Sequence, residues 1–136
     1  MTARDEDGSG PTSRMTHGQV CYLQIPAIDV GKSAAFYEQV FGKPADMVDE
    51  ENGFAGWQVG SGYLGVLQHS DMGGATKDPG RVMLNFETAQ VKEEFERLKA
   101  LGAVVVREPY EMGGGWIATL ADPDGNYFQL MTPMPA

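Results

Sequence analysis

Residues that commonly carry metal or thiol chemistry are scarce in this chain of 136 residues. Its single cysteine, Cys21, cannot form an internal disulfide, which agrees with a reducing compartment. Its two histidines, His17 and His69, lack a partner at the spacing that metal ligands require. We therefore expect Cys21 to be a small buried hydrophobic residue, and neither histidine to bind a metal.

Basic residues and long hydrophobic runs are also lacking. Ten Lys and Arg against 19 Asp and Glu give a formal net charge of -9. This charge repels phosphate backbones and anionic lipid, so neither nucleic acid nor a membrane is an expected partner. No apolar run approaches the ~20 residues of a spanning helix, and the polar N-terminus lacks the apolar segment of a secretory signal. The sequence thus predicts a cytoplasmic protein.

What is present suits one globular domain, since a chain of this length with 42% hydrophobic residues can bury a core. Residues 1–17 mix small, polar and charged residues without apolar periodicity, which predicts a disordered tail. We expect the domain to span 18–133. It divides into a first module at about 18–70, a linker at about 71–80 and a second module at about 81–133.

The first module begins with an alternating strand at 19–25, which Pro26 ends. Asp29 is suited to cap a helix with an apolar stripe, and Gly42 stands where a left-handed C-cap is wanted. Apolar strands at 53–59 and 63–68, joined by a glycine turn, then predict a hairpin.

The second module repeats this order. Residues 81–86 alternate as a strand, Thr88 is placed to cap a helix, and Gly102 stands where Gly42 stood. Strands are expected at 103–107, 116–121 and 127–131, the last after a turn at 122–125. Trp57 and Trp116 are 59 residues apart, and Gln68 and Gln129 are 61 apart, so a duplicated unit predicts an α+β fold of two βαβββ modules.

Several motifs together resemble the vicinal-oxygen-chelate superfamily of glyoxalase, bleomycin-resistance and dioxygenase-like proteins. They are Asp29 before the first helix, Phe36-Tyr37 within it, Phe41-Gly42 at its end, and Asp122-Pro123-Asp124-Gly125 before an alternating strand. The resemblance implies that the two modules form a cup-shaped mixed sheet with helices on the convex face and a ligand pocket on the concave face. We also predict a homodimer, because a cup of two modules leaves open sheet edges, which are commonly paired or covered.

Metal-containing members of this superfamily hold a divalent ion with His, Glu or Gln at four strand positions. By the resemblance, these positions fall on Tyr22, Gln68, Arg81 and Gln129. This set suits a cation poorly, because a guanidinium carries a fixed positive charge and cannot deprotonate to coordinate. We therefore expect no metal cofactor. The alternative is that these four positions are assigned in the wrong register, and that the protein is a metal-dependent lyase, isomerase or dioxygenase.

Strand alternation predicts which side chains line the cup. The candidate ligand-binding residues are Tyr22, Gln24, Trp57, Gln68, Arg81, Asn85, Trp116 and Gln129. Tyr22 and Arg81 are also the candidate catalytic residues, with Tyr22 as a general acid if Arg81 lies beside it. Each of these residues also has a purely structural alternative. Both tryptophans could fill the core, Arg81 could form a surface salt bridge, and the glutamines could be solvated.

Together these features predict a small-molecule-binding protein of the glyoxalase/bleomycin-resistance type. The expected ligand is a polar or anionic organic molecule, because a cavity-facing Arg81 requires an acceptor. Catalysis of a mild step by Tyr22, Arg81 and the glutamines stays open. A third interpretation is an interaction module whose cup is filled by side chains.

Overall fold

A computed structural model describes residues 20–68 and 75–133, and the predicted tail lies outside these ranges. The first module contains β1 (Tyr22–Pro26), α1 (Val30–Phe41), β2 (Met47–Asp49), β3 (Phe54–Val59) and β4 (Gly62–Leu67). The second contains β5 (Leu84–Glu87), α2 (Val91–Ala100), β6 (Val104–Met112), β7 (Gly115–Ala121) and β8 (Tyr127–Met131). Neither helix of the described ranges is long and apolar enough to cross a membrane.

The strands form two mixed sheets with the same topology. The first sheet has the order β1-β4-β3-β2 and the second the order β5-β8-β7-β6. In each sheet the first strand pairs in parallel with the last, and the other neighbours are antiparallel. The helix after the first strand makes the crossover that this parallel pairing requires. The predicted α+β fold of two βαβββ modules is therefore confirmed.

The ends of α1 lie where the sequence places them. The Asp29 carboxylate accepts a hydrogen bond from the Lys32 backbone N–H at 3.1 Å, as an N-cap does. Gly42 ends the helix with a left-handed φ of 70°, and its N–H donates to the Glu38 carbonyl.

The start of α2 differs from the prediction. Gln90 is the N-cap and makes no side-chain capping bond, while the Thr88 hydroxyl accepts from the Gln90 backbone N–H at 3.1 Å. The predicted cap at Thr88 is therefore wrong, because that hydroxyl closes the turn before the helix.

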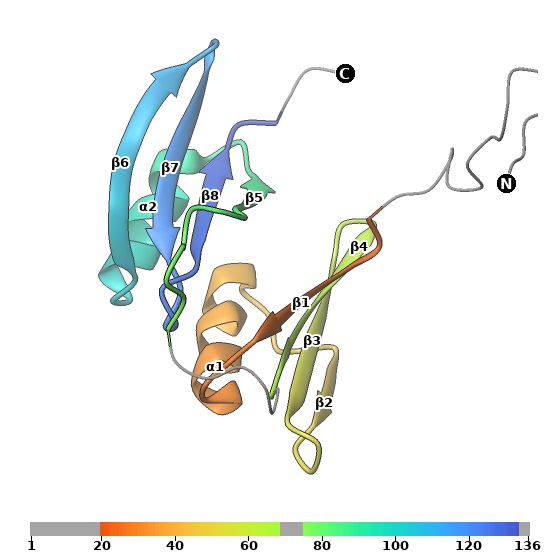
Figure 1. The fold of residues 1–136 in the computed structure, drawn as a ribbon. Coiled ribbons are helices and arrows are strands. Elements are labelled where there is room, and N and C mark those ends of the chain that lie inside the picture. Colours follow the sequence, from red (N-terminus) through yellow and green to blue (C-terminus); the bar gives the residue numbers. More distant parts are fainter. Residues whose placement is uncertain (1–19, 69–74, 134–136) are drawn as a thin grey trace, which may run out of the picture.

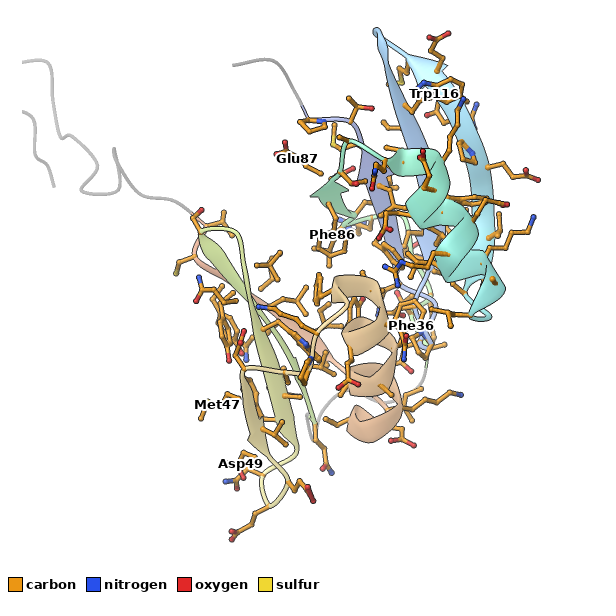
Figure 2. All side chains as sticks on the ribbon, turned by 180° about the vertical axis from the view of Figure 1, so that it is seen from behind. Phe36, Met47, Asp49, Phe86, Glu87 and Trp116 are labelled. Carbon is orange, nitrogen blue, oxygen red and sulfur yellow. The ribbon has the colours of Figure 1, made fainter. Side chains whose placement is uncertain are left out.

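Helix α1 lies between the two sheets (Figure 1), and α2 lies against the second sheet (Figure 2). The Tyr37 ring of α1 packs against Trp57 of the first sheet and Phe128 of the second, with centroids 6.4 and 6.5 Å apart. Phe41 meets Phe86 edge to face at 5.3 Å. The helices therefore cover one face of each sheet around a shared core. We call the uncovered faces the open faces.

The turn after β7 joins the second module to α1. The buried Asp122 carboxylate accepts hydrogen bonds from the Tyr37 hydroxyl at 2.8 Å and from the backbone N–H groups of Asp124 and Asn126. Asp124 in turn accepts from the Ile28 backbone N–H at 3.2 Å. Burial, and then the Asp122 charge, raises the pKa of Tyr37 well above its usual value. The neutral hydroxyl is thus the form that the fold stabilises.

The bounds of β5 and β6 and the exposure of Cys21 depart from the sequence prediction. Strand β5 begins at Leu84 and not at Arg81, whose backbone N–H donates to the Asp78 carbonyl within a turn. Strand β6 extends to Met112, because register shifts on both sides of Arg107 break the alternation that the prediction followed. Cys21 is exposed, so the prediction of burial is wrong.

Candidate functional site

Four polar residues lie in one line across the open face of the second sheet. Arg107 of β6 is in register with Thr119 of β7, Thr119 with Gln129 of β8, and Gln129 with Asn85 of β5. Residues that pair across strands share a face of the sheet. The alternate residues Leu120, Phe128 and Leu130 are buried on the helix side, so this line lies on the open face. We call the four residues the polar row.

Hydrogen bonding orients the centre of the polar row. The Gln129 side-chain Nε2 donates to the Thr119 hydroxyl at 3.0 Å. Thr119 is buried and Gln129 is half-buried, so water competes weakly for this bond. The Gln129 carbonyl oxygen receives no hydrogen bond from the described residues and is available as an acceptor.

Arg107 supplies the positive charge of this face. Its guanidinium lies 3.8 Å from the centroid of the Tyr110 ring, close enough for a cation–π interaction. Arg107 is exposed, and among the described residues no carboxylate lies within ion-pair distance of it. Arg107 was predicted to end a strand at 103–107 and was not among the candidate site residues. Its pairing with Thr119 follows from a bulge that alternation alone does not reveal.

The sequence-predicted residues fall into separate groups. Asn85 and Gln129 belong to the polar row, whereas Tyr22 and Gln24 are paired with Tyr63 and Gly65 on the open face of the first sheet. Arg81 is exposed in the turn before β5, and no hydrogen bond joins it to Tyr22 within the described ranges. The structure thus gives no support to Tyr22 and Arg81 as an acid pair.

Both tryptophans lie on the helix side of their sheets. Trp57 is fully buried, contacts Tyr37 and Phe41, and donates its indole N–H to the Lys43 carbonyl at 3.1 Å. Trp116 packs against the core, with the Lys92 ammonium 3.6 Å from its ring centroid (Figure 2). The core alternative therefore holds for both, because alternation along β3 and β7 turns these side chains away from the open faces.

The four positions implied for a metal lie on different kinds of structure. Tyr22 lies on β1 and Gln129 on β8, whereas Gln68 follows the end of β4 and Arg81, with its fixed positive charge, lies in a turn. Within the described ranges, no group of three or more His, Cys, Asp or Glu residues could hold a metal ion. The donor set therefore does not fit the divalent ion that metal-dependent relatives would require.

Two hollows lie where the modules meet. One, of about 300 Å³, is lined by β1 residues including Gln24 and by Val82, Leu84 and Tyr127. Another, of about 500 Å³, is lined by Phe41, Phe86 and Leu130, with Asn85 and Glu87 at its polar parts. Both volumes are in the range of small-molecule sites. Gln24 and Asn85 thus line different hollows.

Comparison with known proteins agrees with this architecture. A family model described as a glyoxalase-like domain matches residues 22–131. A lactoylglutathione lyase of Arabidopsis thaliana is 31% identical over 121 residues, which cover 79% of this chain. The chain spans 43% of the length of that relative.

Solved structures show the same fold. A glyoxalase-related enzyme from Fulvimarina pelagi matches with a TM-score of 0.70 and 24% identity, over 88% of this chain and 94% of that one. A glyoxalase/bleomycin resistance protein/dioxygenase family enzyme from Burkholderia phytofirmans matches with a TM-score of 0.64 and 26% identity, over 83% and 97%. The chain therefore belongs to the glyoxalase-like domain family, within the vicinal-oxygen-chelate superfamily that its motifs resemble.

Proposed function

We propose that this protein binds a small polar or anionic organic molecule on its open faces without a metal. The observation that carries the proposal is Arg107, a guanidinium without a carboxylate partner among the described residues, in line with Thr119, Gln129 and Asn85. A guanidinium offers a planar fork of donors that matches a carboxylate, and the carboxamides add neutral donors and acceptors. We therefore assign anion binding to Arg107, in place of Arg81, for which the sequence predicted that role.

The alternative is a metal-dependent lyase, isomerase or dioxygenase. Its support is the 31% identity to a lactoylglutathione lyase, and the names of the solved enzymes. Its weakness is the donor set, because Arg81 carries a fixed positive charge in a turn and Gln68 lies beyond the end of β4. Binding is therefore the function that the residues of this chain support best.

Calorimetric titration of small carboxylates tests the proposal. Arg107→Gln removes the charge of the polar row, and Arg81→Gln removes an equal charge from an exposed turn outside it. Loss of a charge-assisted hydrogen bond predicts about tenfold weaker binding by Arg107→Gln and less than about twofold change by Arg81→Gln.

The paired variants separate local recognition from net charge, because both make the chain more negative by one unit. Equal losses of affinity in the two variants, or none in either, would rule out carboxylate recognition by the polar row. Binding that depends on added divalent metal would favour the enzyme alternative instead.

We further propose a cytoplasmic homodimer. The edge strands support dimerisation: β2 exposes Met47 and Val48, and β6 exposes Val104 and Met112, and open edges of this kind are commonly paired or covered. Sedimentation is expected to give twice the mass of the chain at micromolar concentration. A single-chain mass would contradict the dimer.

A further inference from the structure

The open face of the first sheet carries three aromatic rings on three adjacent strands. They are Tyr22 of β1, Tyr63 of β4 and Phe54 of β3, which we call the aromatic platform. The Tyr22 and Tyr63 ring centroids are 5.7 Å apart at an angle of 46°. Tyr22 is 38% exposed and the other two residues are half-buried. These rings are outside the core that the helices cover.

Two glycines explain why the rings lie against the sheet. Gly56 and Gly65 are register partners on β3 and β4. A Cβ atom at Gly65 would lie 2.6 Å from the Tyr22 hydroxyl oxygen and 2.8 Å from a Phe54 ring carbon, and one at Gly56 would clash with the Tyr63 ring. The rings therefore occupy the space that side chains would otherwise fill. This arrangement extends the aromatic groups along the sheet.

The polar groups of the platform are the two tyrosine hydroxyls. Among the described residues, no hydrogen bond from the Tyr22 or Tyr63 hydroxyl is present, so both remain available. Desolvation, and then the negative charge of Asp46, raises the pKa of Tyr63, which keeps its hydroxyl protonated at neutral pH. The nearby Asp46 carboxylate is paired with the Lys43 ammonium at 3.2 Å, whereas the open face of the second sheet carries the guanidinium of Arg107.

We infer that the aromatic platform binds the planar, uncharged aromatic part of the ligand, with a tyrosine hydroxyl donating to a carbonyl or ring nitrogen on it. Aromatic surfaces favour flat conjugated partners through stacked or edge-to-face contacts, which a puckered saturated ring cannot make equally well. This inference rests on the proposed binding function and assigns the ligand class of the first sheet. It does not require the polar row.

The test compares 2-naphthamide with its fully saturated decahydro counterpart, which has the same carboxamide but no planar ring. Calorimetry is expected to show about three- to tenfold tighter binding of the planar probe by the wild-type protein. Tyr22→Leu should abolish this preference, because it removes one ring of the platform. Tyr22→Phe should keep the preference, because the ring remains.

Gly65→Ala gives an independent disruption, since its methyl group would displace the Tyr22 and Phe54 rings. It should reduce the preference for the planar probe, with circular dichroism confirming that each variant is folded. Equal affinity of the wild-type protein for both probes, binding of neither probe, or an unchanged preference in folded Tyr22→Leu would overturn the platform. Carboxylate binding that responds to Arg107→Gln would survive that outcome, so failures of the two proposals are distinguishable.

Discussion

The Tyr37 hydroxyl lies where the first module meets the second, within a buried hydrogen-bond network. Its bond to Asp122 is 2.8 Å long, and Asp122 also holds the turn after β7. We expect Tyr37→Phe to lower the free energy of unfolding by about 1–2 kcal/mol, because a buried acceptor loses one of its donors. Denaturant unfolding measures this loss. Tyr22→Phe is the control, since its hydroxyl has no partner among the described residues.

The same residue predicts a pH dependence. The folded protein has a raised Tyr37 pKa, so it holds that proton more tightly than the unfolded chain does. The contribution of Tyr37 to stability is therefore complete below pH about 10 and is lost as pH rises further. Unfolding measured from pH 8 to 11 should show a shallower alkaline decline for Tyr37→Phe than for the wild type. Identical pH profiles would contradict this role.

Single residues also show how far sequence reasoning reaches. Gln129 and Asn85 were predicted on the open face because strict alternation along β8 and β5 determines their direction. Arg107 could not be placed in this way, because register shifts on both sides of it interrupt the alternation. Arg81 was assigned to a strand because its segment alternates, yet it lies in the turn that leads into β5.

At the scale of elements, a glycine within α1 and the glycine at its C-cap predict effects of opposite sign. Gly42 has a left-handed φ of 70°, which alanine adopts only with strain. A Cβ atom there would meet nothing within 4 Å, so any loss of stability on substitution by alanine comes from the backbone conformation and not from a steric clash. Gly42→Ala should destabilise the protein by about 1 kcal/mol. Gly31 lies within the helix without a positive φ, and a Cβ there makes only an ordinary 3.5 Å contact with Asp29. Gly31→Ala should stabilise by roughly 0.5 kcal/mol.

Thermal unfolding of both variants checks this pair of predictions. Changes of the same sign would show that packing at these positions, and not the left-handed conformation of Gly42, determines the result.

The elements themselves were predictable where local signals were strong. The ends of α1 follow from Asp29 and Gly42, and β8 follows from its alternation after the Asp122–Gly125 turn. Strand β2 was missed because its three residues, Met47–Asp49, are too few to show a period. The start of α2 was misplaced because Thr88 bonds within the preceding turn, a choice that the sequence does not distinguish from capping.

At the scale of the whole molecule, the duplicated pattern was sufficient to predict the fold. The two modules share one topology, and each contributes one helix to the shared core. The site was less predictable, because it depends on which face each side chain occupies in three dimensions. Trp57 and Trp116 illustrate this, since their matching places in the repeat reflect matching roles in the core.

The central claim is that the chain keeps the family fold while its residues at the implied metal positions suit organic ligands. Tyr22 lies in the aromatic platform, Gln129 in the polar row, and Arg81 in an exposed turn. The most direct test is elemental analysis of untagged protein purified after growth in metal-replete medium. The account predicts far less than one transition-metal ion per chain. About one tightly held nickel, zinc, iron or manganese ion per chain would contradict it.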